Sequence, residues 1–344
     1  MLLFAIIVYV FLFFIIFFKA NIYVREPSMN YLCKENTDSI KAVCAIIVMI
    51  HHISNELEYG FAFLPFQMAG YLMVALFFFY SGFGLCFSLL QDDKYISKFL
   101  YNRLNKLFIP FGVATLAYVC FYLFVVGEFN PIRLLSQFLF EEPVVKNSWF
   151  ILVLIYLYFI FWLCFKILGK RKLSWCIWII VLLIWSFCVF VPYWAPTIVC
   201  FAIGFMIAYY KKVVDRLIKK YNVSISICSF AFVIALSFFK HKTGMLEDMF
   251  NMFSAIFFVL FVLSISTRIQ IHNRILSFFS TISLEIYLYH GLVMLALNKI
   301  QFIYSRPIIY FLLTVIISIF TSWMMARMKR VLCEFRFRKS KNCR

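Results

Sequence analysis

The sequence lacks the short motifs by which many enzymes bind nucleotide phosphates or metals. It has neither a Walker loop nor a glycine-rich dinucleotide fingerprint, which argues against an ATP-driven pump and a nicotinamide-dependent enzyme. Its 11 cysteines are scattered singly, with no C-x-x-C pair and no cluster of cysteine and histidine. The sequence therefore predicts neither a bound metal nor a disulfide framework. No long polar stretch separates the apolar segments, so no appended soluble domain is expected.

Apolar residues make up 65% of the chain, and the mean hydropathy is +0.94. These values lie well above those of soluble domains, and the apolar residues form long runs rather than amphipathic stripes. We therefore predict an all-α, polytopic membrane protein with about 11 transmembrane helices. The predicted segments lie at residues 1–18, 41–58, 68–90, 107–127, 148–168, 174–191, 195–210, 223–239, 249–267, 278–297 and 307–326.

The first apolar segment resembles a secretion signal in length but not in its flanks. It has no basic region at its start and no small-residue cleavage site before Lys19, so we expect a retained helix. Three parts are predicted on this basis. They are an N-terminal helix with its linker at 1–40, a membrane domain at 41–326 and a basic tail at 327–344.

The distribution of lysine and arginine predicts the orientation of the chain. If the N-terminus lies outside, the outer loops contain only six basic residues, and the inner loops and the tail contain the other 27 of 33. The positive-inside rule then gives an outer N-terminus and a cytoplasmic C-terminus. The net charge of +18 follows from this topology, so nucleic-acid binding is not expected. The tail is expected to contact anionic lipid of the bilayer.

Lys41 and His52 are ionisable residues in an otherwise apolar run. Eleven helical positions return to within roughly 20° of the starting direction and rise about 16 Å, so the two side chains share a face. His51 lies about 80° from Lys41 by the same geometry. Such groups in a membrane segment indicate a protein interior or a water-filled path, although snorkelling side chains would give the same pattern. Glu56 follows His52 at i+4, where its carboxylate could orient the imidazole.

His290 lies in the tenth predicted segment, about 18 Å from a cytoplasmic start near residue 278, which is close to the depth of His52. Two histidines at one depth favour a single site. Tyr287 and Ser283 precede His290 by one and two turns and share its face, whereas Glu285 points elsewhere. A single membrane histidine more often acts as a helix-packing hydrogen-bond partner. The pairing in depth, with lysine and glutamate nearby, favours a functional site.

A basic cluster of Lys98, Arg103 and Lys106 precedes Pro110 at the predicted cytoplasmic mouth. Ammonium and guanidinium groups bind phosphate oxygens by charge-assisted hydrogen bonds, so the cluster suits an anionic, phosphate-bearing ligand. Ordinary positive-inside anchoring explains the same residues.

Taken together, these segments resemble acyltransferase family 3, the integral-membrane O-acyltransferases of cell-surface and exported glycans. Lys41 and His52 match the family's Arg/Lys-x10-His helix, and residues 103–106 with Pro110 resemble its R-x-x-R pair before a proline. Three further segments match its pattern in order: LFFFYSGFGL at 76–85, NSWFILVLIYLYF at 147–159 and SLEIYLYH at 283–290. The resemblance covers residues 38 to 326. Lysine replaces arginine at positions 41 and 106, which keeps the charge but loses the bidentate fork.

The resemblance implies a ten-helix core behind one additional N-terminal helix, in a multi-pass protein of the plasma membrane. It implies transfer of an acyl group, commonly acetyl, from cytoplasmic acyl-coenzyme A to a hydroxyl of a glycan, with no permanently bound cofactor. Lys41, Arg103 and Lys106 would bind the donor. His52 would act as general base or in an acyl relay, and Glu56 would orient it. His290 and Tyr287 would bind the acceptor or support the acyl carbonyl.

Two other functions fit parts of the sequence. An exporter or flippase of a glycan or lipid-linked sugar would use the polar residues to line a passage without making a bond. Such a protein is expected to have spans broken by glycine and proline, but the chain has only 10 glycines and 8 prolines and no internal repeat. A membrane sensor whose basic tail recruits a partner is the third alternative.

Overall fold

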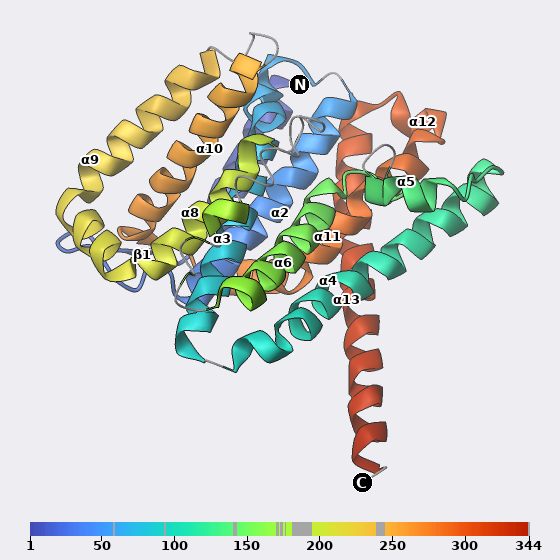
Figure 1. Cartoon of the computed structure of the whole chain (residues 1–344). Helices are drawn as coiled ribbons and strands as arrows, with labels where there is room; N and C mark the ends of the chain where they lie inside the picture. The colour runs from blue at the N-terminus through green and yellow to red at the C-terminus, as the bar shows by residue number, and fades with distance from the viewer. Residues whose placement is uncertain are drawn as a thin grey trace.

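A computed structural model describes residues 1–57, 59–92, 94–139, 143–169, 195–238 and 245–342, together with positions 172, 175 and 177–180. The described chain is almost entirely helical (Figure 1). Its helices are α1 (Leu2–Phe17), α2 (Lys34–Glu56), α3 (Leu64–Gln91), α4 (Tyr95–Phe121), α5 (Arg133–Leu139), α6 (Trp149–Leu168), α8 (Ala195–Tyr209), α9 (Lys211–Phe238), α10 (Met245–Ser266), α11 (Arg274–Asn298), α12 (Gln301–Tyr304) and α13 (Pro307–Asn342). Two short strands, β1 (Asn21–Ile22) and β2 (Ile269–Gln270), form the only described sheet.

Eight helices in the described part of the chain are long and apolar enough to cross a membrane. The shorter apolar helices Leu2–Phe17 and Pro196–Tyr209 coincide with two further predicted segments. The predicted segment at 174–191 lies mostly outside the described residues. The all-α membrane architecture thus agrees with the sequence, while the count of 11 spans and the orientation stay predictions.

Helix α2 begins at Lys34, seven residues before the apolar segment from which it was predicted. Hydropathy marks the part of a helix that suits lipid and not the first helical residue, which explains the difference. Glu35 lies in the first turn, where its negative charge interacts favourably with the helix dipole. The polar first turns of α2 therefore extend beyond the apolar segment and place Asp38 and Lys41 at one end of the bundle.

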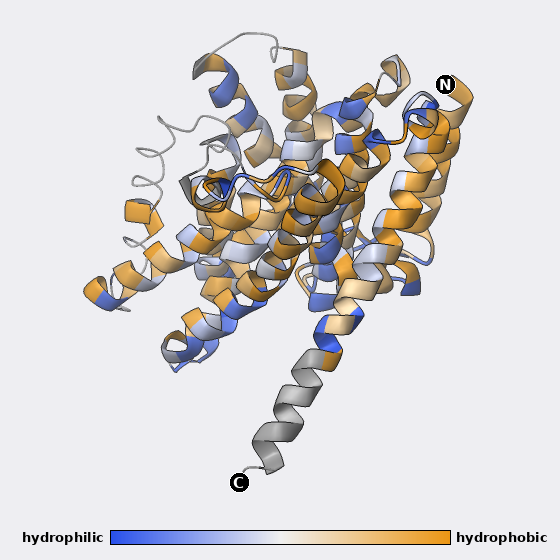
Figure 2. Ribbon diagram, turned by 90° about the vertical axis from the view of Figure 1, so that its right-hand side faces the viewer, coloured by the Kyte–Doolittle hydropathy of each residue, from blue (hydrophilic) through white to orange (hydrophobic). Residues whose placement is uncertain are grey.

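Helices α2, α3 and α11 form the centre of the bundle (Figure 1). Helix α3 packs against α2 on one side and against α8 and α10 on the other, and α13 packs along α11. Helices α9 and α10 form a hairpin at one edge (Figure 1), and α4 packs against α6. Hydrophobic residues dominate along the helices, and hydrophilic residues gather at helix ends and loops (Figure 2). This pattern is expected for a bundle whose outer surface faces lipid.

The crossing of α3 and α8 is close enough to require glycine on both helices. A Cβ atom added to Gly82 would lie 2.9 Å from the carbonyl carbon of Phe201 and still nearer its oxygen. A Cβ atom on Gly204 would lie 2.9 Å from the carbonyl carbon of Phe79. Small residues let membrane helices approach until their backbones touch. The two glycines therefore fix α3, which contributes a wall of the site described below.

Residues 19–33, here called the strap, connect α1 to α2 and are tied to the segment between α10 and α11. Strands β1 and β2 pair antiparallel, with Asn21 opposite Gln270. The Arg268 guanidinium donates to the carbonyl oxygen of Val24 at 2.8 Å, and the Ser28 backbone N–H donates to the Thr267 carbonyl oxygen at 2.8 Å. These bonds hold the strap across one end of the bundle.

Candidate active site

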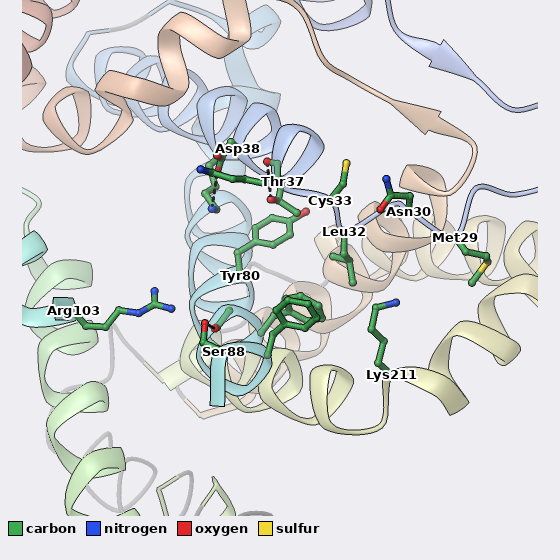
Figure 3. A pocket seen from close by; sticks show the side chains of 15 residues that line it. Met29, Asn30, Leu32, Cys33, Thr37, Asp38, Tyr80, Ser88, Arg103 and Lys211 are labelled. Atoms are coloured by element: carbon green, nitrogen blue, oxygen red, sulfur yellow. Dashed lines mark hydrogen bonds and ion pairs between the residues drawn. The ribbon is translucent and has the colours of Figure 1, made fainter. Parts of the chain in front are cut away.

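A cavity of about 650 Å³ opens at the end of the bundle where α2 begins (Figure 3). Its wall is built from the strap, the first turns of α2, the second half of α3 and single residues of α4 and α9. The lining residues are Met29, Asn30, Leu32, Cys33, Lys34, Thr37, Asp38, Lys41, Tyr80, Phe83, Gly84, Phe87, Ser88, Arg103 and Lys211. Four of these side chains are cationic and one is a carboxylate, so the cavity suits an anionic ligand.

Lys41 and Arg103 reach this cavity from different helices and are held by different partners. The Lys41 ammonium lies 3.0 Å from an Asp38 carboxylate oxygen and 5.8 Å from the ring centre of Tyr80. Arg103 donates from Nε to the Tyr95 hydroxyl at 2.8 Å, and Figure 3 shows its guanidinium pointing toward the cavity. The bond at Nε and the Tyr158 ring, whose centre lies 5.9 Å from Cζ, orient the guanidinium, which has further N–H groups for a ligand.

Two residues of the predicted basic cluster lie elsewhere. Lys106 and Lys98 are exposed and do not line the cavity. The structure therefore brings Lys41 together with Arg103 but not with Lys106. Lys211, Asp38 and Tyr80 line the cavity and were not identified from the sequence. Lys211 was counted among the inner loop lysines, and its place beside the cavity depends on how α9 packs.

His52 and His290 meet near the opposite end of α2. Their ring centres are 5.1 Å apart, and the ring planes differ by 19°, which is a stacked arrangement. His290 is fully buried, and its Nδ1 lies 2.9 Å from the carbonyl oxygen of Ile286. Its Nε2 has no hydrogen-bond partner among the described residues. The contact agrees with the matched depths predicted from the helical rise.

His51 makes a different set of contacts from those of its neighbour. Its Nδ1 lies 3.0 Å from the carbonyl oxygen of Phe66, and its ring packs so closely against Gly70 that an added Cβ atom there would force the ring to move. These contacts join α2 to the first turns of α3. His51 thus bridges α2 and α3, and its ring centre lies 4.8 Å from that of His52, while His52 is the histidine that stacks on His290 of α11.

Glu56 does not orient His52, which corrects the prediction from the sequence. Within the described residues, the hydrogen bonds of its carboxylate come from Lys146, at 3.2 Å, and from the amide of Asn298. The Asn298 amide oxygen in turn accepts from the Tyr310 hydroxyl at 2.8 Å. Glu56 is the last residue of α2, where its side chain meets neighbouring segments. The Lys146 ammonium is a stronger donor to a carboxylate than a neutral imidazole.

Tyr287 lies beside His290, with ring centres 6.2 Å apart, but its hydroxyl is already engaged. It donates to the carbonyl oxygen of Asn147 at 2.7 Å and so holds the segment before α6 against α11. The Asn147 amide nitrogen and the Ser148 hydroxyl are buried without a hydrogen-bond partner in the described part of the chain. Ser283, on the same face of α11, donates to the Ser280 carbonyl oxygen. These two unpartnered polar groups thus lie in the segment that Tyr287 holds against α11.

The two ends of this arrangement are joined by one face of α2. Lys41 at the cavity and His52 at the histidine pair are eleven residues apart, a rise of about 16 Å along the helix. A ligand bound at the cavity would need to extend along α2 to reach His52.

The family model described as an acyltransferase domain matches residues 35–327. The chain belongs to acyltransferase family 3. The resemblance seen in the sequence motifs is thereby confirmed, and the protein is an acyltransferase with membrane-spanning helices. No curated protein and no solved structure matches the chain.

Family membership places α2 to α12, and α13 up to Arg327, inside the acyltransferase domain. The match begins at the second residue of α2, so α1 and the strap lie before it. The match includes His52, His290 and the residues described around them. Among the described residues, no group of three or more His, Cys, Asp or Glu side chains could hold a metal ion.

Proposed function

We propose that the protein is a membrane-bound O-acyltransferase of the plasma membrane, which passes an acyl group, in the first instance acetyl, from cytoplasmic acyl-coenzyme A to a hydroxyl of a cell-surface or exported glycan. One observation carries the proposal. A single face of α2 joins a cationic cavity, lined by Lys41 and Arg103, to a stacked histidine pair about 16 Å away along the helix.

The cavity is the donor site in this proposal. Coenzyme A is strongly anionic, and four cationic side chains line the cavity. Arg103 and Lys41 would contact its phosphate groups by charge-assisted hydrogen bonds. The arrangement of basic residues along the chain supports a cytoplasmic location for this end. The thioester end of the donor would extend along α2 toward His52.

His52 is the general base of the proposed reaction. The acceptor hydroxyl gives its proton to the imidazole while its oxygen attacks the thioester carbonyl, and the carbon–sulfur bond then breaks as the ester forms. The imidazolium returns the proton to the departing coenzyme A thiolate, so His52 ends the cycle neutral. His290 stacks against His52 and limits the directions in which its ring can turn. The unpartnered groups of Asn147 and Ser148 are candidates to bind the acceptor.

Isotopic acyl transfer in membranes tests the proposal, with the adjacent histidine as the matched control. His52→Ala should lower the rate by about a hundred- to ten-thousandfold, because a general base contributes that much. His51→Ala removes a packing contact and should keep substantial activity at matched protein level. Equal transfer by His52→Ala and the parent protein would remove this histidine from the chemistry. Absence of transfer by the parent, together with glycan movement across the membrane, would favour an exporter.

A further inference from the structure

The wall of the donor cavity includes residues that precede the family domain. Met29, Asn30, Leu32 and Cys33 belong to the strap, and the family match begins at residue 35. The strap is fixed to the end of α10 and the segment after it by the bonds of Ser28 and Arg268 described above. The cavity is therefore completed by a segment that the matched domain does not contain.

The strap also fixes the position of a lysine on α9. The Tyr31 hydroxyl donates to Asp215 Oδ1 at 2.8 Å, and the Lys211 ammonium donates to Asp215 Oδ2. The same ammonium lies 5.5 Å from the ring centre of Tyr31. Tyr31 is fully buried, and its burial, together with the negative charge of Asp215, raises the pKa of its hydroxyl well above the ordinary value. The hydroxyl therefore stays protonated and keeps donating to Asp215.

Lys211 and Arg103 lie on opposite sides of the cavity, with Tyr80 and Ser88 between them (Figure 3). Asp215 accepts one of the three N–H bonds of the Lys211 ammonium, which leaves two for a ligand. Asp215 does not line the cavity; its carboxylate holds the Lys211 ammonium in place and offsets part of its positive charge. Cationic groups on two sides suit a ligand with two separated phosphate groups. Coenzyme A has such a pair in its diphosphate and its 3′-phosphate.

We propose that Lys211 is a further donor-binding residue, positioned by Asp215 and by Tyr31 of the strap, and that the strap is thereby part of the donor site. This inference rests on the proposed function for the identity of the donor. The chemistry at Lys211 is recognition of a phosphate group, which a coenzyme A thioester or an anionic lipid headgroup could supply. We assign it to the coenzyme A thioester, because the cavity has cationic groups on two sides.

Donor kinetics give the first test. Lys211→Ala should raise the KM for acetyl-coenzyme A on the order of ten-fold, because a charge-assisted hydrogen bond is lost, and should leave kcat nearly unchanged. Lys211→Arg should restore most of the affinity. Lys212→Ala is the matched control, because Lys212 is exposed and lies outside the cavity. Tyr31→Phe and Asp215→Asn should raise KM by smaller factors. Equal KM values for Lys211→Ala and Lys212→Ala would overturn the proposal.

Alkylation of Cys33 gives a second test that does not depend on turnover. Cys33 is a partly exposed free thiol in the strap wall. Coenzyme A should slow its alkylation by a maleimide, measured by mass spectrometry of the Cys33 peptide in purified full-length protein. The protection should need several-fold more coenzyme A in Lys211→Ala than in Lys212→Ala. Dephospho-coenzyme A should protect less well than coenzyme A in the parent protein.

The two tests separate this inference from the proposed function. Transfer activity with no effect of Lys211→Ala on KM or on protection would refute the role of Lys211 and leave the acyltransferase proposal standing. Protection of Cys33 that depends on Lys211, in a protein without transfer activity, would support the phosphate site and count against the proposed reaction. Nanodiscs with and without phosphatidylglycerol distinguish the two phosphate sources. Protection by phosphatidylglycerol alone, unchanged by coenzyme A, would overturn the assignment to a nucleotide thioester.

Discussion

A single methyl group at the α3–α8 crossing should separate the two helices and disturb the cavity proposed to bind the donor. In Gly82→Ala, the new Cβ atom would lie 2.9 Å from the carbonyl carbon of Phe201. Ordinary carbon–carbon contacts lie near 3.5–4.0 Å, so the backbones must move apart by roughly 1 Å. The neighbouring atoms are backbone atoms of α8 and cannot rotate away. Gly204→Ala meets the backbone of Phe79 in the same way.

The cost of this separation follows from the packing of the bundle. Added methyl groups in well-packed interiors typically destabilise a protein by about 1–3 kcal/mol. Alanine favours a helix over glycine by about 1 kcal/mol, which offsets part of this loss. Gly112 on α4 is the matched control, because no atom lies within 4 Å of its added Cβ. Gly112→Ala should therefore be neutral or slightly stabilising, and Gly82→Ala should lower the Tm by several degrees relative to it.

Thermal unfolding in detergent, followed by size-exclusion chromatography, measures the difference. Helix α3 also contributes Tyr80 and Phe83 to the cavity, so Gly82→Ala should raise the KM for the acyl donor as well. The reasoning fails if Gly82→Ala melts at or above the temperature of Gly112→Ala. It also fails if Gly82→Ala is less stable but Gly204→Ala is not, because both changes part the same pair of helices.

Three further outcomes are expected. Arg103→Ala should raise the KM for the acyl donor and weaken the dependence of that KM on salt. Lys106→Ala, at an exposed position outside the cavity, should change neither. Similar kinetics of the two variants would contradict the proposed placement of the donor. Because Glu56 pairs with Lys146, Glu56→Gln should lower the free energy of unfolding by about 1 kcal/mol and leave the pH dependence of acyl transfer unchanged. A shifted pH profile would instead argue for a link between Glu56 and His52. A cysteine in place of Lys299 should react with an impermeant reagent in intact cells and one in place of Ser340 should not; the reverse result would place the donor cavity outside the cell.

Helical geometry was enough to predict the features that depend on one helix. The eleven-residue spacing placed Lys41 and His52 on one face of α2, and the rise along α11 placed His290 at the depth of His52. The stacked rings bear out this depth. The adjacent His51 was correctly expected to point elsewhere. These properties follow from the rise and rotation of a regular helix, so they can be predicted without knowing which other helices pack against it.

Partners chosen between helices could not be predicted in the same way. Glu56 lies one turn from His52, yet its carboxylate pairs with Lys146 and Asn298, which are distant in sequence. Lys211 faces the cavity because α9 packs where it does, and its sequence context of paired lysines suggested only an inner loop. The strap mixes polar and apolar residues with no periodic pattern. Its role became visible only from its pairing with residues 267–270.

The pairing of β1 with β2 also determines when the strap can be held in place during biosynthesis. The strap is made early, but its partner strand begins at Ile269, close to 250 residues later. At typical elongation rates of 5–20 residues per second, the strap waits roughly 12–50 s for its partner. Helices α2 and α3 can insert and pack during this interval while the strap is not yet held by its partner strand. If the cavity is the donor site, as proposed, that site is complete only after α10 and the strand that follows it have been made.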